Sequence, residues 1–274
     1  MMLKFKPLYQ QVIFMTGCTS GIGLATLHRA VEQGAKVFMV DRNEEELQIV
    51  QDEMRLKGYD TAYTIADVRE FDQLQFAVDQ CLKTFGGIDT FINNSEDPIM
   101  AESSIKEKIE ESKNHFDRNF WGVVNGCRTA IPVLKSGGGG IINISHIPRL
   151  SSSEQAGLKS ASQLAIKGYT EDLRNELKQQ GIPIQVSMVT VATQAKRKAS
   201  SEKKASLVAL YTSPVYSEEE NAAKAILQCA IKPRKELRLG FVPFKNMFKN
   251  GFTRKSGLGI LGGITYLFSK KRFS

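Results

Sequence analysis

Cysteine is scarce in this sequence, with 4 residues in 274 and no Cys-x-x-Cys pair. Disulfide frameworks and zinc sites both require cysteines at short, regular spacings, so we expect neither, and no metal site is predicted. No secretory leader is expected ahead of these thiols, which favours reduced cysteines and a cytoplasmic location. The four residues are Cys18, Cys81, Cys127 and Cys229.

Apolar runs long enough to cross a bilayer are also missing. A glycine-rich apolar stretch at residues 257–268 is too short for a span. It lies in a basic tail, because residues 232–274 hold eleven lysines and arginines and one acid. Two roles remain open for this tail: a peripheral membrane contact with anionic lipid, or packing on its own domain or a sister subunit.

The rest of the chain has little net charge. The tail from residue 232 carries a formal charge of +10, so the remaining body carries −2 of the total of +8. A nearly neutral body argues against a nucleic-acid-binding domain built around a basic groove, and we expect no nucleic-acid partner.

Apolar segments of strand length alternate with amphipathic segments along the body. The pattern predicts helices at residues 44–57, 71–85 and 218–231. Strands that are apolar on both faces and separated by helices describe a parallel sheet covered on both sides. We therefore expect an α/β fold, a doubly wound three-layer sandwich of Rossmann type. The predicted strands lie at residues 11–16, 35–40, 61–66, 88–93, 140–145, 182–189 and 236–242.

The expected organisation is one dinucleotide-binding domain over residues 1–242, followed by a tail over residues 243–274. Residues 194–214 interrupt the regular alternation and include the basic stretch KRKASSEKK. A loop after the sixth strand would lie over the crevice at the carboxyl ends of the strands. A lid over that crevice and a solvated surface loop are both compatible with the pattern.

The stretch TGCTSGIG, residues 16–23, joins the first predicted strand to the first predicted helix. Spaced glycines at this point allow a tight turn, close approach of a pyrophosphate and close packing of the helix on the sheet. The amide dipoles at the helix start would face the anion. We expect a dinucleotide to bind here through Gly17, Ser20, Gly21, Ile22 and Gly23.

An acid, Asp41, ends the second predicted strand. A carboxylate at this position accepts hydrogen bonds from the adenosine ribose and repels a 2′-phosphate, which favours NAD over NADP. Arg42 leaves NADP open, because its guanidinium could pair with that phosphate. The alternative structural role for Asp41 is to cap the following helix.

These motifs together resemble the short-chain dehydrogenases/reductases over roughly residues 8–242. The resemblance implies that Asp67 and Val68, after the third strand, hold the adenine. NNSE at residues 93–96 is similar to the family's Asn-Asn-Ala-Gly, so Asn93 is expected at the cofactor, whereas Glu96 stands where glycine is usual. The resemblance also places Asn119 at the asparagine that anchors a proton-relay water.

The same resemblance shows where this chain departs from the family. The family's serine, tyrosine and lysine respectively orient a carbonyl, donate a proton and bind the nicotinamide ribose. With the family's spacing, these positions fall on His146, Lys159 and Gln163. No Tyr-x-x-x-Lys occurs in this region, and Tyr169 is expected to pack in the core.

Two functions follow from this departure. In the first, the protein binds NAD(P) but is inactive or atypical as an oxidoreductase, and it acts as a nucleotide sensor or an interaction partner. In the second, it is an active carbonyl or alcohol oxidoreductase in which His146 polarises the substrate and Lys159 transfers a proton. Gln163 can bond a ribose hydroxyl in either case but carries no charge. The small-molecule substrate is not identified.

A third possibility is a scaffold that has lost nucleotide binding. For assembly, the resemblance implies pairing through the helices at residues 114–134 and 157–180, as a dimer or tetramer. The partner would be a second copy or an active relative in a hetero-oligomer.

Overall fold

The computed structural model describes residues 5–19, 21–94, 108–148, 157–193 and 216–240. The residues at 194–215 and the tail from 241 onward therefore lie outside the described residues, as does the expected domain boundary at 242. Within the described ranges, no helix is both long enough and apolar enough to cross a membrane.

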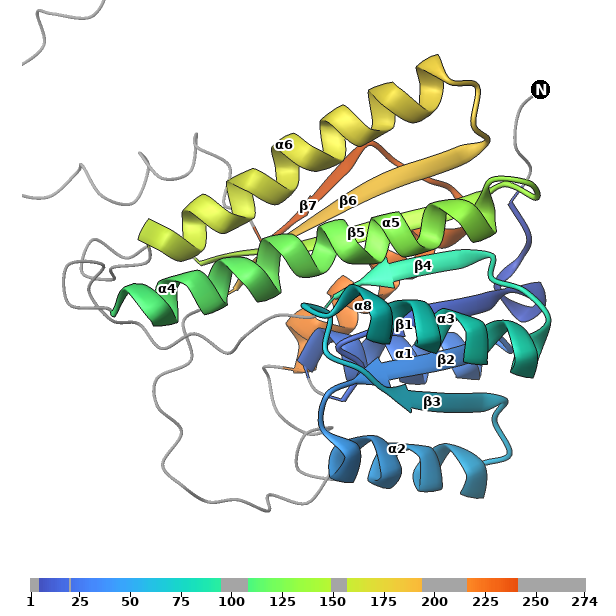
Figure 1. Ribbon diagram of the computed structural model, residues 1–274. Coiled ribbons are helices and arrows are strands. Elements are labelled where there is room, and N and C mark those ends of the chain that lie inside the picture. Colours follow the sequence, from blue (N-terminus) through green and yellow to red (C-terminus); the bar gives the residue numbers. More distant parts are fainter. Residues whose placement is uncertain (1–4, 20, 95–107, 149–156, 194–215, 241–274) are drawn as a thin grey trace, which may run out of the picture. The chain divides into compact units, whose positions relative to one another are not determined.

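Seven parallel strands form one sheet in the order β3-β2-β1-β4-β5-β6-β7, which confirms the predicted fold class (Figure 1). The strand order reverses between β1 and β4, and ligands bind in the crevice beyond the strand ends at such a point. The strands are β1 Val12–Thr16, β2 Lys36–Asp41, β3 Thr61–Ile65, β4 Thr90–Asn93, β5 Gly139–Pro148, β6 Ile184–Thr193 and β7 Glu236–Leu239.

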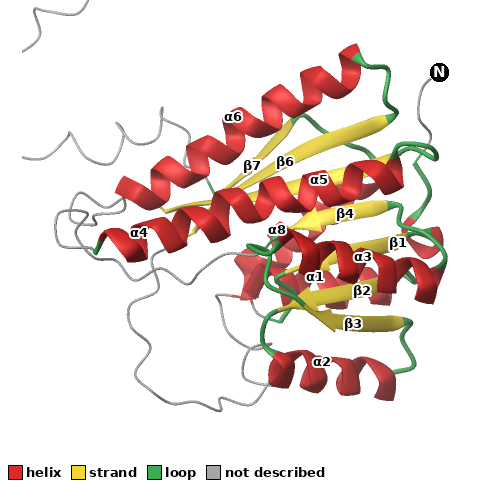
Figure 2. Ribbon diagram, in the orientation of Figure 1, coloured by secondary structure: helices red, strands yellow, loops and turns green. Residues whose placement is uncertain are grey.

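Helices cover both faces of this sheet (Figure 2). One apolar core lies between the sheet and α1, α2 and α8, and the other lies between the sheet and α3, α5 and α6. The central strands β1 and β4 are buried along their whole length, as strands covered on both faces must be. The helices are α1 Gly21–Glu32, α2 Glu44–Leu56, α3 Phe71–Phe85, α4 Ile109–Phe116, α5 Gly122–Leu134, α6 Gly157–Gln179 and α8 Tyr216–Ile231.

The helix predicted at residues 114–134 differs from the structure in two respects. It begins earlier, at Ile109, and a π turn over Asp117–Trp121 separates α4 from α5. The N–H of Gly122 bonds the carbonyl of Asp117, five residues earlier, as a π turn requires. Such turns re-aim side chains inside a helix and often occur at functional sites.

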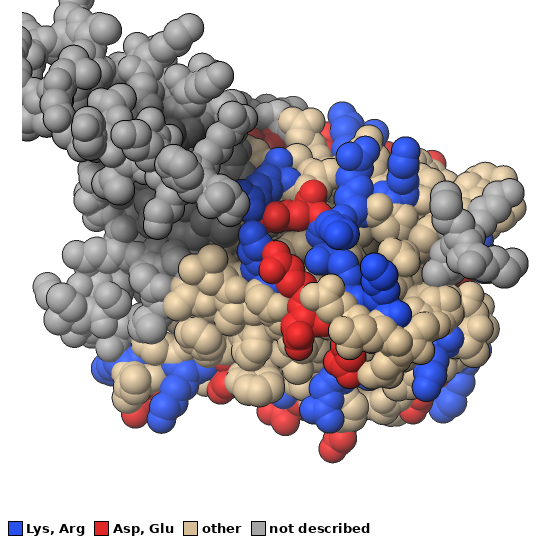
Figure 3. Space-filling model, turned by 90° about the horizontal axis from the view of Figure 1, so that it is seen from above, with Lys and Arg blue, Asp and Glu red and all other residues tan. Residues whose placement is uncertain are grey.

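Helix α6, uppermost in Figure 1, is fastened to the sheet edge by polar contacts. The Arg174 guanidinium donates to the carbonyls of Val186 (3.0 Å) and Lys235 (2.7 Å). Lys167 pairs with Glu236 on β7 at 3.6 Å. Seen from above, this side of the molecule carries basic and acidic side chains close together (Figure 3).

Candidate dinucleotide and catalytic site

The glycine turn after β1 has the geometry that the sequence predicts. Gly17 has φ of 64°, in the left-handed region, and its N–H donates to the carbonyl of Val40 at 2.9 Å. A Cβ on Gly23 would stand 1.8 Å from the Gly17 carbonyl oxygen, so no larger residue fits. Ile22 is buried, and Ser20 lies outside the described residues. The start of α1 is thus pressed against the turn.

Asn94 holds this turn from the neighbouring strand. Its side-chain amide donates to the Gly17 carbonyl at 2.7 Å, and its backbone N–H donates to the Thr16 hydroxyl at 3.2 Å. These bonds join segments 77 and 78 residues apart in the chain. We did not predict a cofactor-site role for Asn94, although the Asn-Asn pair at the end of the fourth strand was the available signal.

Asn93, predicted at the cofactor, is used inside the core. Its side-chain amide donates to Asn143 Oδ1 at 2.8 Å, and Asn143 donates in turn to the Thr170 hydroxyl at 3.0 Å. Asn93 Oδ1 also lies where a Cβ on Gly126 would fall, so α5 packs very closely on β4. The cofactor contact of Asn93 stays a prediction.

Asp41 ends β2 beside the glycine turn. Its Oδ1 accepts the N–H of Arg42 at 2.8 Å, and its Oδ2 accepts the Thr19 hydroxyl at 3.0 Å. The alternative, a cap on the next helix, belongs to Asn43, whose side chain accepts the N–H of Glu46. Asp41 is therefore held in place by the phosphate turn itself.

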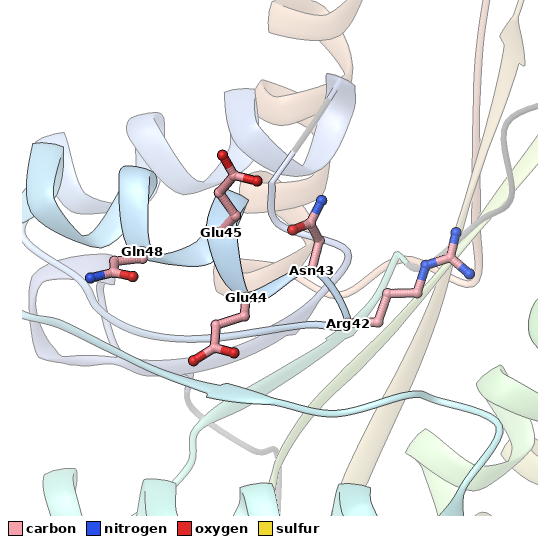
Figure 4. A pocket seen from close by; sticks show the side chains of 5 residues that line it. All are labelled: Arg42, Asn43, Glu44, Glu45 and Gln48. Carbon is pink, nitrogen blue, oxygen red and sulfur yellow. The ribbon is translucent and has the colours of Figure 1, made fainter.

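An open pocket lies at the start of α2, among the residues that follow Asp41 in the sequence (Figure 4). The exposed Arg42 side chain extends away from the carboxylates of Glu44 and Glu45 in this view. The pocket is lined by Arg42, Asn43, Glu44, Glu45 and Gln48.

Cys18 lies in the turn but is fully buried, and its thiol donates to the Val40 carbonyl at 3.7 Å. Burial raises the pKa of the thiol, and the nearby Asp41 charge raises it further. The helix N-terminus therefore does not activate Cys18, because a buried, protonated thiol is a poor nucleophile.

The predicted adenine pair, Asp67 and Val68, follows β3. Both Asp67 carboxylate oxygens accept hydrogen bonds from the Arg69 guanidinium, at 2.6 to 3.1 Å. Burial acts to raise the pKa of Asp67, but the Arg69 bonds and charge outweigh it and hold the pKa below its ordinary value. Val68 packs on Gly122, where a Cβ would stand 2.6 Å from a Val68 methyl. Asn125 donates to the carbonyls of Val68 and Arg69 at 3.0 Å each.

Arg118 and Asn119 lie in the π turn, and both are buried. Burial lowers the pKa of Arg118, and the charges of Arg42 and Arg69 lower it further, while Asp67 and Asp41 act in the opposite direction. The π turn therefore brings a guanidinium into the electrostatic surroundings of the predicted adenosine end, which the sequence did not reveal. Asn119, expected at the family's relay position, is 2% exposed.

The three residues that the resemblance assigns to the family's chemical groups lie where β5 meets α6. Gln163 is 2% exposed, and its amide oxygen accepts the backbone N–H of His146 at 3.1 Å. His146 is 8% exposed. The backbone of Lys159 lies one turn earlier in α6, and its side chain is outside what is described. Tyr169 packs edge-on against Phe120 at 6.1 Å, which confirms its structural role.

Helix α8 adds an unexpected charge beside the phosphate turn. The Oε1 atom of Glu219 lies 3.6 Å from the point that a Cβ on Gly21 would occupy. On α1, Arg29 forms an ion pair with Glu220. A carboxylate therefore stands next to the residue at which the pyrophosphate is expected.

Comparison with known proteins decides the family. The family model described as short chain dehydrogenase matches residues 11–204. The chain belongs to this family. An uncharacterized oxidoreductase of Bacillus subtilis, YxnA, is 34% identical over 245 residues, covering 87% of this chain and 67% of that protein. A 3-dehydrosphinganine reductase of Arabidopsis thaliana, TSC10B, is 34% identical over 188 residues, covering 65% and 54%. The chain thus spans about half to two thirds of the length of these two relatives.

Solved structures agree on the fold. A short-chain dehydrogenase/reductase from Burkholderia phymatum in complex with NAD has a TM-score of 0.71 and 20% identity, covering 86% of this chain and 90% of that one. A short-chain type dehydrogenase/reductase from Mycobacterium marinum gives a TM-score of 0.70, also at 20% identity, covering 85% and 94%. The family's members bind NAD(P), so family membership supports dinucleotide binding by this chain.

Proposed function

We propose that this protein binds NAD(H) at the carboxyl edge of the sheet and turns over carbonyl or alcohol substrates slowly or not at all, acting as a nucleotide sensor or an interaction partner. The observation that carries this proposal is the Gln163–His146 contact. A neutral amide, nine-tenths or more buried, bonds the backbone of β5 at the position where the family has a lysine.

The missing charge matters for the chemistry. In the family, the lysine ammonium binds the nicotinamide ribose and lowers the pKa of the catalytic tyrosine. Gln163 supplies no charge, and its oxygen is already bonded to a backbone N–H. General acid–base groups typically contribute about 10² to 10⁴ in rate, so losing both the acid and the group that tunes it removes most of the turnover.

The dinucleotide would bind with its pyrophosphate on the start of α1 and its adenosine toward β2 and β3. Gly17, Gly21 and Gly23 would admit the pyrophosphate, with Ser20 and Ile22 alongside. Asp41 would accept the ribose hydroxyls, which favours NAD over NADP. The cofactor itself would supply a hydride at its nicotinamide ring when bound.

The test is to titrate the full chain with NADH and NADPH, following nicotinamide fluorescence, and then to assay turnover on a panel of carbonyls and alcohols. We expect saturable NADH binding and turnover at background. If neither nucleotide binds, the chain is a scaffold and the proposal is wrong.

A second function, an active oxidoreductase, is favoured by His146. Its side chain is almost fully buried at the carboxyl end of β5, where burial and neighbouring groups can tune an imidazole for proton transfer. Turnover that disappears in both His146→Ala and Lys159→Ala would support this function. Turnover that survives both variants would exclude these residues as the reacting groups.

We also propose that the chain forms dimers through α4, the π turn and α6. Three large apolar side chains are exposed on these elements: Ile109, Trp121 and Leu164, at 61%, 50% and 63%. Helix interfaces bury such side chains. Light scattering should give twice the monomer mass, and Leu164→Asp should give the monomer, whereas Leu56→Asp on α2, also at an exposed position, should not.

A further inference from the structure

Thr19 connects two carboxylates at the adenosine end of the crevice. Its hydroxyl oxygen lies 3.0 Å from Asp41 Oδ2 and 2.9 Å from Glu46 Oε2. Thr19 comes from the phosphate turn, Asp41 from the end of β2 and Glu46 from the first turn of α2. Three separate elements therefore place two negative charges within reach of a single hydroxyl.

Glu46 reaches Thr19 instead of capping its own helix. It is the third residue of α2, and an acid at this position often bonds back to the N-cap backbone. Here its N–H donates to Asn43 Oδ1 at 3.3 Å, while its carboxylate is directed to the phosphate turn. The Glu46 carboxylate therefore contacts the phosphate turn at the crevice and does not cap α2.

Thr19 alone cannot donate a hydrogen bond to both of these carboxylates. A threonine hydroxyl donates a single hydrogen bond, so Thr19 can satisfy one of the two carboxylates at a time. Among the described residues, Asp41 has a second donor, the N–H of Arg42, on its other oxygen. The exposed Glu46 carboxylate can therefore accept a further hydrogen bond, and a ribose 2′,3′-diol carries two hydroxyl protons.

We propose that Glu46, joined to Asp41 through Thr19, is a specificity determinant that selects NAD(H) against NADP(H). This inference rests on the proposed dinucleotide binding. The free 2′-hydroxyl of NAD donates into the carboxylate pair. A 2′-phosphate donates no proton at neutral pH and brings about two further negative charges toward two carboxylates.

The neighbouring arginines do not cancel this preference for NAD(H) over NADP(H). Arg69 is engaged by the Asp67 carboxylate through three contacts of its guanidinium. Arg118 is buried. Arg42 is exposed, so solvent and salt screen its charge. The second carboxylate, that of Glu46, therefore raises the affinity for the unphosphorylated ribose relative to the affinity for the 2′-phosphorylated ribose.

The experiment compares the binding of NADH and NADPH to the full chain carrying Glu46→Gln. We expect the NADH-to-NADPH affinity ratio to fall about three- to tenfold, mainly through tighter NADPH binding. Glu45→Gln is the matched control, because it removes the same charge one residue away and has no contact with Thr19 among the described residues. Its ratio should change by less than about twofold.

Two Thr19 variants separate this role from a structural one. Thr19→Val keeps the shape, removes the shared proton and should weaken NADH binding, whereas Thr19→Ser keeps the hydroxyl and should restore it. Equal ratio changes in Glu46→Gln and Glu45→Gln would overturn the inference while leaving dinucleotide binding intact, as would an unaltered ratio in both. Failure of the unsubstituted chain to bind either nucleotide would instead overturn the proposed function together with the inference.

Discussion

The two ends of the crevice are built differently. At the β1–α1 end, the turn is held by Asn94, Val40 and Asp41 in the geometry that dinucleotide binding needs. At the β5–α6 end, the Gln163 amide oxygen accepts the backbone N–H of His146, at the position that the resemblance assigns to the family's lysine. Both ends are well packed, so the proposed change of reactive groups at the second end is accompanied by an intact local architecture.

The largest expected effect comes from a substitution in the glycine turn, at the β1–α1 end of the crevice. Gly23→Ala places a methyl 1.8 Å from the Gly17 carbonyl oxygen and 2.7 Å from the Asn94 side-chain nitrogen, and the Gly17 backbone leaves little room to relax. We expect NADH binding to weaken at least about 100-fold, with stability lowered by about 1–3 kcal/mol. Fluorescence titration and thermal unfolding measure both effects.

Gly168→Ala is the matched control, because this helical glycine has nothing within 4 Å of the point that an added methyl would occupy. Alanine there should leave binding unchanged and raise stability by up to about 1 kcal/mol. If Gly23→Ala binds as well as the control, the turn is not the pyrophosphate site.

The second prediction tests whether Gln163, at the β5–α6 end of the crevice, stabilises the fold. Gln163→Ala leaves the buried N–H of His146 without its acceptor, which should cost about 1–3 kcal/mol and lower Tm by roughly 2–10 °C. Gln180→Ala removes an exposed Gln–Glu bond to Glu176 and should change stability by less than about 0.5 kcal/mol. Equal Tm values for the two variants would show that the Gln163–His146 bond does not stabilise the fold.

A third prediction concerns how far the adenosine end is preorganised. Asp67→Asn should lower stability by about 1 kcal/mol at pH 7, because it removes the Arg69 pair. The folded-state pKa of Asp67 lies below the unfolded value of about 3.9, so this stability is present above about pH 4. It is lost as the pH falls through the folded-state value.

Urea unfolding at pH 7 and near pH 3 measures this difference, which should shrink at the lower pH. Asp60→Asn is the control, because its pair with Lys36 is long, at 3.7 Å, and exposed. A pH-independent gap between Asp67→Asn and the unsubstituted chain would contradict the assigned cause.

The smallest expected effect comes from removing a charge beside the same glycine turn. Glu219→Gln removes a charge near the expected pyrophosphate and should tighten NADH binding about two- to threefold. The gain should become smaller at high salt, since salt screens a charge that is partly exposed. Glu218→Gln, on the same helical turn but exposed, should have a smaller effect, and a reversed order would show that Glu219 does not face the anion.

The sequence predicted the elements well because apolar periodicity is local. The helix at residues 71–85 and the seven strands lie where they were expected, although β5 and β6 run further, to Pro148 and Thr193. The π turn at residues 117–121 was missed, since a single i to i+5 turn leaves no trace in apolar spacing. Its effect is to bring Arg118 near the adenosine end, which no linear pattern indicates.

The candidate site was predicted less completely, because its residues are held by partners far away in the chain. The bonds of Asn94 to Gly17 and of Thr19 to Glu46 span 77 and 27 residues. A motif names which residues face the crevice but not which hydrogen bonds they make. For Asn93, the motif suggested the cofactor, whereas its amide is bonded to Asn143 in the core.

The chain of amides and hydroxyl from Asn93 through Asn143 to Thr170 has a further consequence. It fixes β4, β5 and α6 against one another from beneath the crevice, and Thr170 lies two helical turns from Gln163. A shift of one residue in β5 would turn Asn143 to the opposite face and break both bonds. The backbone at residues 146, 159 and 163 is therefore positioned by this buried network as well as by the Gln163–His146 bond, so a substitution at one of these residues leaves part of its support in place.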